Sequence, residues 1–99
     1  MLDKVKLALA LSANTFDTEL RELITAAVLD LKIAEVNSEA VTSEPTDSLV
    51  SRAITSYCVY HFELEHGDTN KAERFKAAYD EQKAQMGMRE GYTVWTAAT

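Results

Sequence analysis

The sequence has very few of the residues on which small disulfide-stapled, metal-binding or nucleotide-binding proteins depend. Its 99 residues include one cysteine, one proline and three glycines. The single cysteine, Cys58, excludes an intrachain disulfide and a cysteine-rich metal site, so a reducing cytoplasm is the expected place of synthesis. The glycines form no phosphate-binding loop, because all three are expected at helix ends or in the C-terminal tail.

Positive charge and long apolar runs are also scarce. Sixteen acidic against ten basic residues give a net charge of −6, which is the opposite of the basic footprint of proteins that neutralise phosphates. No run reaches the roughly 20 apolar residues that span a membrane. The start, MLDKVKLALALSA, is expected to be a short helix and not a secretory signal, because its apolar run is short and Asp3 interrupts its basic end.

What the sequence does contain is a series of amphipathic helical patterns. An apolar fraction of 46% and a charged fraction of 26% are ordinary for a folded domain. A domain of this size buries only about 60 to 65% of its unfolded surface, so association with other subunits would add stability. The patterns predict an all-α fold, a compact bundle of about four helices in residues 1–87 with an extended C-terminal arm in residues 88–99.

The second expected helix has an apolar arc too wide for one partner. A short helix over Asp3–Leu11 precedes it, and Asp17 is expected to cap its start. One stripe should pack in the bundle, namely Leu20, Leu23, Ile24, Ala27, Val28 and Leu31. A second stripe beside it is predicted to meet a neighbouring subunit, and consists of Leu29, Ile33 and Val36.

A polar loop and two more helices follow. Residues 37–46 contain the only proline among serines, threonines and glutamates, which predicts a loop. The third helix should end by Gly67, and Gly87 should stop the fourth. The capping candidates are Asp47 or Thr46 for the third helix and Asp68, Thr69 or Asn70 for the fourth. Five aromatic side chains are predicted on the packing faces of this pair: Tyr57, Tyr60, Phe62, Phe75 and Tyr79.

No catalytic or metal-binding pattern accompanies these aromatic residues. His61 and His66 are five residues apart, which turns them about 140° apart on a helix and denies them the shared face of a metal-ligating pair. Cys58 lies in an apolar run, so we interpret it as a buried side chain and not as a nucleophile. We therefore expect no enzymatic activity, no cofactor and no metal.

The C-terminal tail alternates like a single strand or an extended arm. Tyr92, Val94 and Trp95 lie in it, and tyrosine and tryptophan are enriched at the centres of protein interfaces. A lone strand needs hydrogen-bond partners from elsewhere. We interpret the tail as an interface segment, with a tail folded back on its own bundle as the alternative.

Taken together, several segments resemble the head-to-tail connector proteins of long-tailed bacteriophages. The likeness covers about residues 2–92 and is carried by KVKLAL, a polar turn before Phe16 and Asp17, ELRELITAAVLDLKIA, LVSRAITSYCVYHF and AERFKAAYDEQKAQM. It implies a helical adaptor in the virion that forms a ring of about a dozen copies under the portal. The ring would extend the DNA channel and receive tail-side completion proteins, with Met88 to Thr99 reaching toward the portal.

Two other interpretations stay open at this point. Net negative charge and an exposed tail also suit a small acidic helical regulatory module that binds one partner. A small helical enzyme or metal-binding protein would have to use His61, Cys58 or His66.

Overall fold

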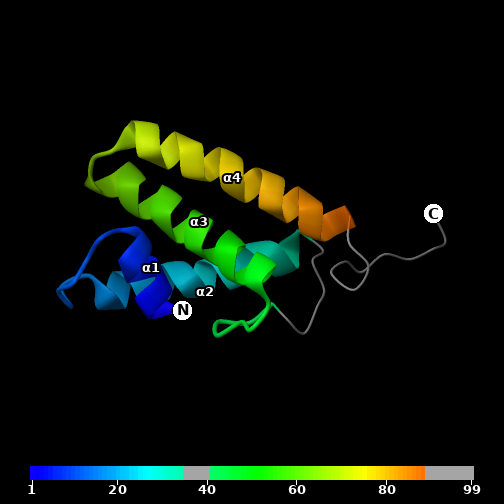
Figure 1. Cartoon of the computed structure of the whole chain (residues 1–99), viewed down its shortest axis with the longest axis horizontal. Helices are drawn as coiled ribbons and strands as arrows, with labels where there is room; N and C mark the ends of the chain where they lie inside the picture. Colours follow the sequence, from blue (N-terminus) through cyan, green and yellow to red (C-terminus); the bar gives the residue numbers. More distant parts are fainter. Residues whose placement is uncertain (35–40, 89–99) are drawn as a thin grey trace.

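The computed structural model describes residues 1–34 and 41–88, which form four α-helices and no strand within those ranges. The helices are α1 (Leu2–Ala8), α2 (Asp17–Ile33), α3 (Ser48–His66) and α4 (Thr69–Met88). Figure 1 shows α3 and α4 running antiparallel, with α3 lying between α4 and α1. The predicted all-α fold is confirmed, whereas the extended arm predicted after α4 lies outside the described residues from position 89 onward.

The central helix is α3, because it packs on all three other helices. Its most extensive partner is α4, and α2 and α1 cover the rest of its surface. Eight of its residues are buried, and they occur all round the helix between Val50 and Phe62. A helix that is apolar on most sides must lie inside a bundle, so its composition accounts for its position.

The apolar stripes predicted on α2 and α4 face the core, as their helical periodicity indicates. On α2, Leu20, Ile24, Ala27 and Leu31 are buried. On α4, the buried residues are Ala72, Tyr79, Gln82 and Met86, with Phe75 half-buried. Tyr79 meets Tyr57 of α3 with ring centroids 5.3 Å apart, an edge-to-face contact of the kind that adds about 0.5 to 1.5 kcal/mol beyond area burial.

Polar caps define the turn between α3 and α4 and the start of α3. The Asp47 carboxylate accepts hydrogen bonds from the backbone N–H groups of Leu49 and Val50, at 2.9 and 3.2 Å. Gly67 ends α3 with a φ of 130°, a backbone conformation that residues other than glycine rarely adopt. Asp68 then accepts from the N–H of Lys71 at 2.9 Å. Asp47 and Asp68 are therefore the caps among the predicted candidates.

One expected cap and one expected helix end are wrong, although α2 starts at Asp17 as expected. Asp17 does not cap α2, since the N-cap is Phe16 and Asp17 is the first helical residue. Its carboxylate instead forms an ion pair with Lys6 at 2.9 Å, because α1 ends beside the start of α2 and supplies a cation there. Gly87 does not stop α4, which continues through it to Met88; one glycine near a helix end costs only about 1 kcal/mol and can be tolerated.

The predicted loop contributes to the core. The described part of it, residues 41–46, lies outside the helices as expected. Val41, however, is only 2% exposed and belongs to the main apolar cluster. A single apolar residue in a polar segment has no periodicity, so no pattern in the sequence marks it as buried.

Candidate interaction surfaces

The outer edge of α2 exposes large apolar side chains. Leu29 is 56% exposed and Ile33 is 78% exposed, whereas Val28 beside them is half-buried. We call Leu29 and Ile33 the α2 edge. They lie on the stripe that the sequence assigned to a neighbouring subunit, but Val36, the third member of that stripe, lies outside the described residues. Covering apolar surface returns about 25 cal/mol per Å², so this edge is a favourable place for a contact.

A shallow hollow of about 500 Å³ adjoins the α2 edge. Its lining comes from two segments: Thr25, Val28, Leu29 and Lys32 of α2, and Val41, Thr42 and Ser43 of the segment before α3. The hollow gives a partner's side chain somewhere to enter, which a flat helix face would not.

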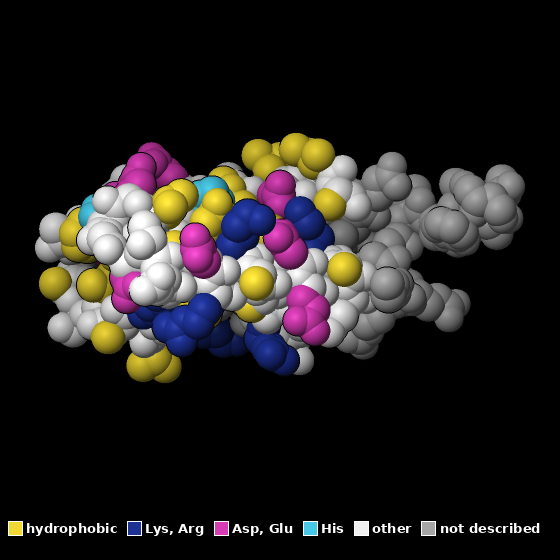
Figure 2. Space-filling view, turned by 90° about the horizontal axis from the view of Figure 1, so that it is seen from above, with side chains coloured by type: hydrophobic (Ala, Val, Ile, Leu, Met, Phe, Trp, Pro, Cys, Tyr) yellow, Lys and Arg dark blue, Asp and Glu magenta, His cyan; other side chains and the backbone are white. Residues whose placement is uncertain are grey.

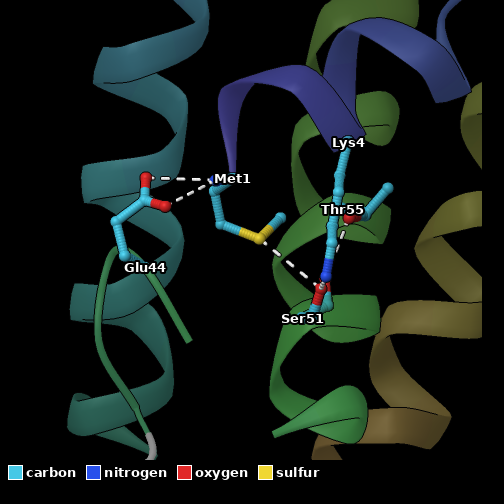
Figure 3. Close-up of polar contacts among 5 residues, drawn as sticks. All are labelled: Met1, Lys4, Glu44, Ser51 and Thr55. Carbon is cyan, nitrogen blue, oxygen red and sulfur yellow. Dashed lines mark hydrogen bonds and ion pairs between the residues drawn. The ribbon is translucent and has the colours of Figure 1, made fainter. Parts of the chain in front are cut away.

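The start of the chain holds that segment in place. Figure 3 shows the Met1 amino group facing both carboxylate oxygens of Glu44, to which it donates hydrogen bonds at 2.8 and 3.0 Å. The Met1 side chain is 1% exposed, and Ser51 of α3 donates to its sulfur at 3.5 Å. Lys4 donates to the Ser51 hydroxyl at 3.2 Å. These contacts join α1, the 41–47 segment and α3, which fixes one wall of the hollow.

A second surface is a groove among α1, α3 and α4, with a volume of about 580 Å³. We call it the three-helix groove. It is lined by Lys4, Leu7 and Ala8 of α1, by Ser48, Ser51, Arg52, Thr55 and Ser56 of α3, and by Phe75, Ala78 and Gln82 of α4. No carboxylate belongs to this lining among the described residues.

His66 makes structural contacts at the end of α3. Its Nε2 lies 2.8 Å from a carboxylate oxygen of Glu19 on α2, and its ring packs against Phe16 and Phe62 with centroids 5.0 and 4.2 Å apart. Glu65 brings a second carboxylate near the same point. All three polar groups are partly or fully exposed, and exposed acidic groups commonly cluster without a metal. The sequence did not predict the contact with Glu19, which joins residues 47 positions apart.

His61 and Cys58 are placed for packing. The His61 ring contacts the rings of Tyr57 and Tyr60, with centroids 4.2 and 4.5 Å away. Burial lowers the pKa of His61 from its usual 6.5, against the opposing effect of the Asp30 and Glu65 carboxylates. Burial raises the pKa of the Cys58 thiol to about 12, so the thiolate that a nucleophile requires is almost absent at neutral pH.

The predicted interface residues therefore divide into two groups. Leu29 and Ile33 are exposed on α2 where a partner can reach them. Tyr92, Val94 and Trp95 lie outside the described residues, as does Val36. The three-helix groove is the surface that sequence reasoning missed, because its lining comes from three helices that are far apart in the sequence.

A small helical chain that exposes large apolar side chains on α1, α2 and α3, and that has a groove lined by Lys4 and Arg52, has surfaces suited to contacts with other proteins. Comparison with protein families supports a role in assembly. The chain matches the family described as phage connector protein over residues 1–93, and it belongs to that family. No curated protein and no solved structure matches the chain. The resemblance inferred from the sequence is thus confirmed.

Membership of this family has direct consequences. Phage connector proteins are structural proteins, so the chain has a structural role as a virion component that contacts other head or tail proteins. None of the described helices is both long enough and apolar enough to cross a membrane.

Proposed function

We propose that this protein is a head-tail adaptor that forms a ring of about a dozen copies under the portal. The ring extends the DNA channel and links the packaged head to tail-side completion proteins. Family membership supports the connector role, and the α2 edge is the observation that carries the ring: Leu29 and Ile33 are exposed without a partner among the described residues.

A closed ring needs two different surfaces on each copy, one meeting the other on the next copy. The α2 edge and its hollow supply one such surface, with apolar side chains beside a concavity. A domain of 99 residues gains stability from such contacts, because its own core is small.

The segment that follows α4, with Tyr92, Val94 and Trp95, acts in this proposal as the portal-facing arm. A net charge of −6 lets DNA pass through the ring, because few phosphates are neutralised. The protein has no catalytic role, in keeping with a Cys58 thiol that is buried and protonated.

Native mass spectrometry and negative-stain electron microscopy, with and without the portal ring of the same phage, test this function. Wild-type protein should form rings, alone or on the portal. Replacing Leu29 and Ile33 together by aspartate should abolish them, because charges would be buried at an apolar contact. The matched control replaces Ala77 and Ala84, two exposed positions of α4, by aspartate.

Two results would overturn the proposal. One is a wild-type protein that stays monomeric and never binds the portal. The other is a defined dimer or one-to-one complex without a ring, which would favour the acidic regulatory module. Rings that form equally well in the Leu29 and Ile33 double variant would remove the α2 edge as the lateral interface.

A further inference from the structure

The three-helix groove exists because α1 and α4 both pack on α3 and leave part of its N-terminal half uncovered. Ser51 and Ser56 of α3 line it, and α1 and α4 contribute residues to either side. Its volume of about 580 Å³ lies in the range of about 300 to 1,000 Å³ over which proteins bind ligands and side chains.

The charge of the groove is opposite to that of the chain. Lys4 and Arg52 are its only charged lining residues, and neither has a carboxylate partner among the described residues. Four other lysines do have one, at 2.9 to 3.8 Å: Lys6, Lys71, Lys76 and Lys83. Figure 2 looks onto the α4 side of the molecule. Along the lower edge of this view, Lys and Arg side chains lie beside exposed hydrophobic ones. In a protein of net charge −6, Lys4 and Arg52 make the three-helix groove a local cationic site.

Apolar side chains accompany these cations. Leu7 is 82% exposed, the most exposed of the large hydrophobic residues in the described part of the chain. Phe75 is half-buried on the opposite side of the groove, next to Ala78. A free ion or a nucleic-acid backbone would gain nothing from Leu7 and Phe75, whereas a peptide side chain would bury them.

Gln82 adds an unmet hydrogen-bonding requirement. Its side chain is nine-tenths buried and lines the groove, and its Oε1 accepts no hydrogen bond from a described residue. A buried polar atom without a partner is unfavourable, because it has lost its hydrogen bonds to water. Because this oxygen is closed to solvent, a donor from a partner reaches it only if the Gln82 amide turns toward the groove.

We propose that the three-helix groove docks a segment of another virion protein in which a carboxylate lies next to an apolar side chain. The carboxylate pairs with Arg52 and Lys4, and the apolar side chain packs between Leu7 and Phe75. This inference rests on the proposed connector function and assigns a partner contact separate from the α2 edge.

Charge reversal at the groove tests the inference. Binding of the purified portal protein and of the tail-side completion protein is measured by biolayer interferometry for wild type, Arg52→Glu and Arg21→Glu. Arg21 is a matched control, since it is also an exposed helical arginine and lies on α2 away from the groove. Arg52→Glu should weaken binding of one partner about tenfold or more, equivalent to about 1.4 kcal/mol, and Arg21→Glu should leave it unchanged.

A photo-crosslinking amino acid in place of Ala78 identifies the docked segment directly. This test does not depend on whether the charge-reversal variants fold. The crosslinked peptide should come from that partner and contain Asp or Glu within two residues of a large apolar residue. Changing that acid to lysine in the partner should restore binding to Arg52→Glu, because the charges are then exchanged.

The outcomes separate this inference from the connector function. If wild type binds a partner and Arg52→Glu binds it equally well, the groove proposal is wrong and the connector function stands. A crosslink to a second copy of this chain, or Arg52-dependent binding of duplex DNA, also overturns the proposal. Failure of wild type to bind either protein overturns both.

Discussion

The hydroxyl of Tyr79 on α4 donates a hydrogen bond of 2.5 Å to the carboxylate of Asp30 on α2. Lys83, one turn further along α4, lies 3.4 Å from the same oxygen. Burial and the Asp30 carboxylate together raise the pKa of Tyr79, so its hydroxyl keeps its proton at any physiological pH. The aromatic ring thus serves the α3–α4 interface, while its hydroxyl joins α4 to α2.

Tyr79→Phe tests this polar link. The ring keeps its packing, and the lost hydrogen bond should lower the free energy of unfolding by about 1 kcal/mol. The loss stays small because Lys83 and water can still reach the half-exposed Asp30. Urea unfolding followed by circular dichroism measures it. Tyr60→Phe is the control, since the Tyr60 hydroxyl has no hydrogen bond to a described residue; equal losses in both variants would argue against the link.

Val41→Ala tests whether the segment before α3 belongs to the core. Removing two buried methyl groups should cost about 1 to 2 kcal/mol of unfolding free energy. Thr42→Ala, at an exposed neighbouring position, should change stability by less than about 0.5 kcal/mol. Thermal melts of both variants give the comparison, and a Val41→Ala protein as stable as wild type would place Val41 outside the core.

Gly67→Ala tests the backbone of the α3–α4 turn. A methyl group at this position would touch nothing within 4 Å, so the cost is that of the φ of 130° alone. Such strain amounts to about 1 to 3 kcal/mol. Asn70→Ala, three residues on at an exposed position, should be nearly neutral. The denaturant midpoints of both variants measure the difference in stability. A Gly67→Ala protein as stable as wild type would mean that the turn adopts another conformation.

His61 should make stability depend on pH. Because its folded-state pKa is lowered from 6.5, neutral His61 contributes stability that is present above pH 6.5 and lost as the pH falls through the lowered pKa. In His61→Gln, the unfolding free energy should therefore fall less between pH 7 and pH 5 than in wild type. Urea titrations at both pH values measure this, and NMR of the ring gives its pKa directly. A ring that titrates above 6.5 would contradict the prediction.

Much of the helical architecture could be predicted because it depends on neighbours in the chain. The α2 and α4 stripes recur every three or four residues, and Asp47, Gly67 and Asp68 act on backbone groups within four residues of themselves. The prediction for Asp17 failed because the partner of its side chain is not a neighbour in the chain. A capping residue type beside a helix start was recognised, but Lys6, eleven positions away, engages its carboxylate instead.

The sequence alone determined the helices, their order and the exposed second stripe of α2, because periodicity and capping are local properties of the chain. The tertiary structure alone decided which distant groups meet: Val41 with the core, Glu19 with His66, Met1 with Glu44, and the cations of α1 and α3 with Phe75 and Gln82 across one groove. Those contacts depend on how the helices cross and how the connections place them, and no single segment of the sequence encodes that geometry.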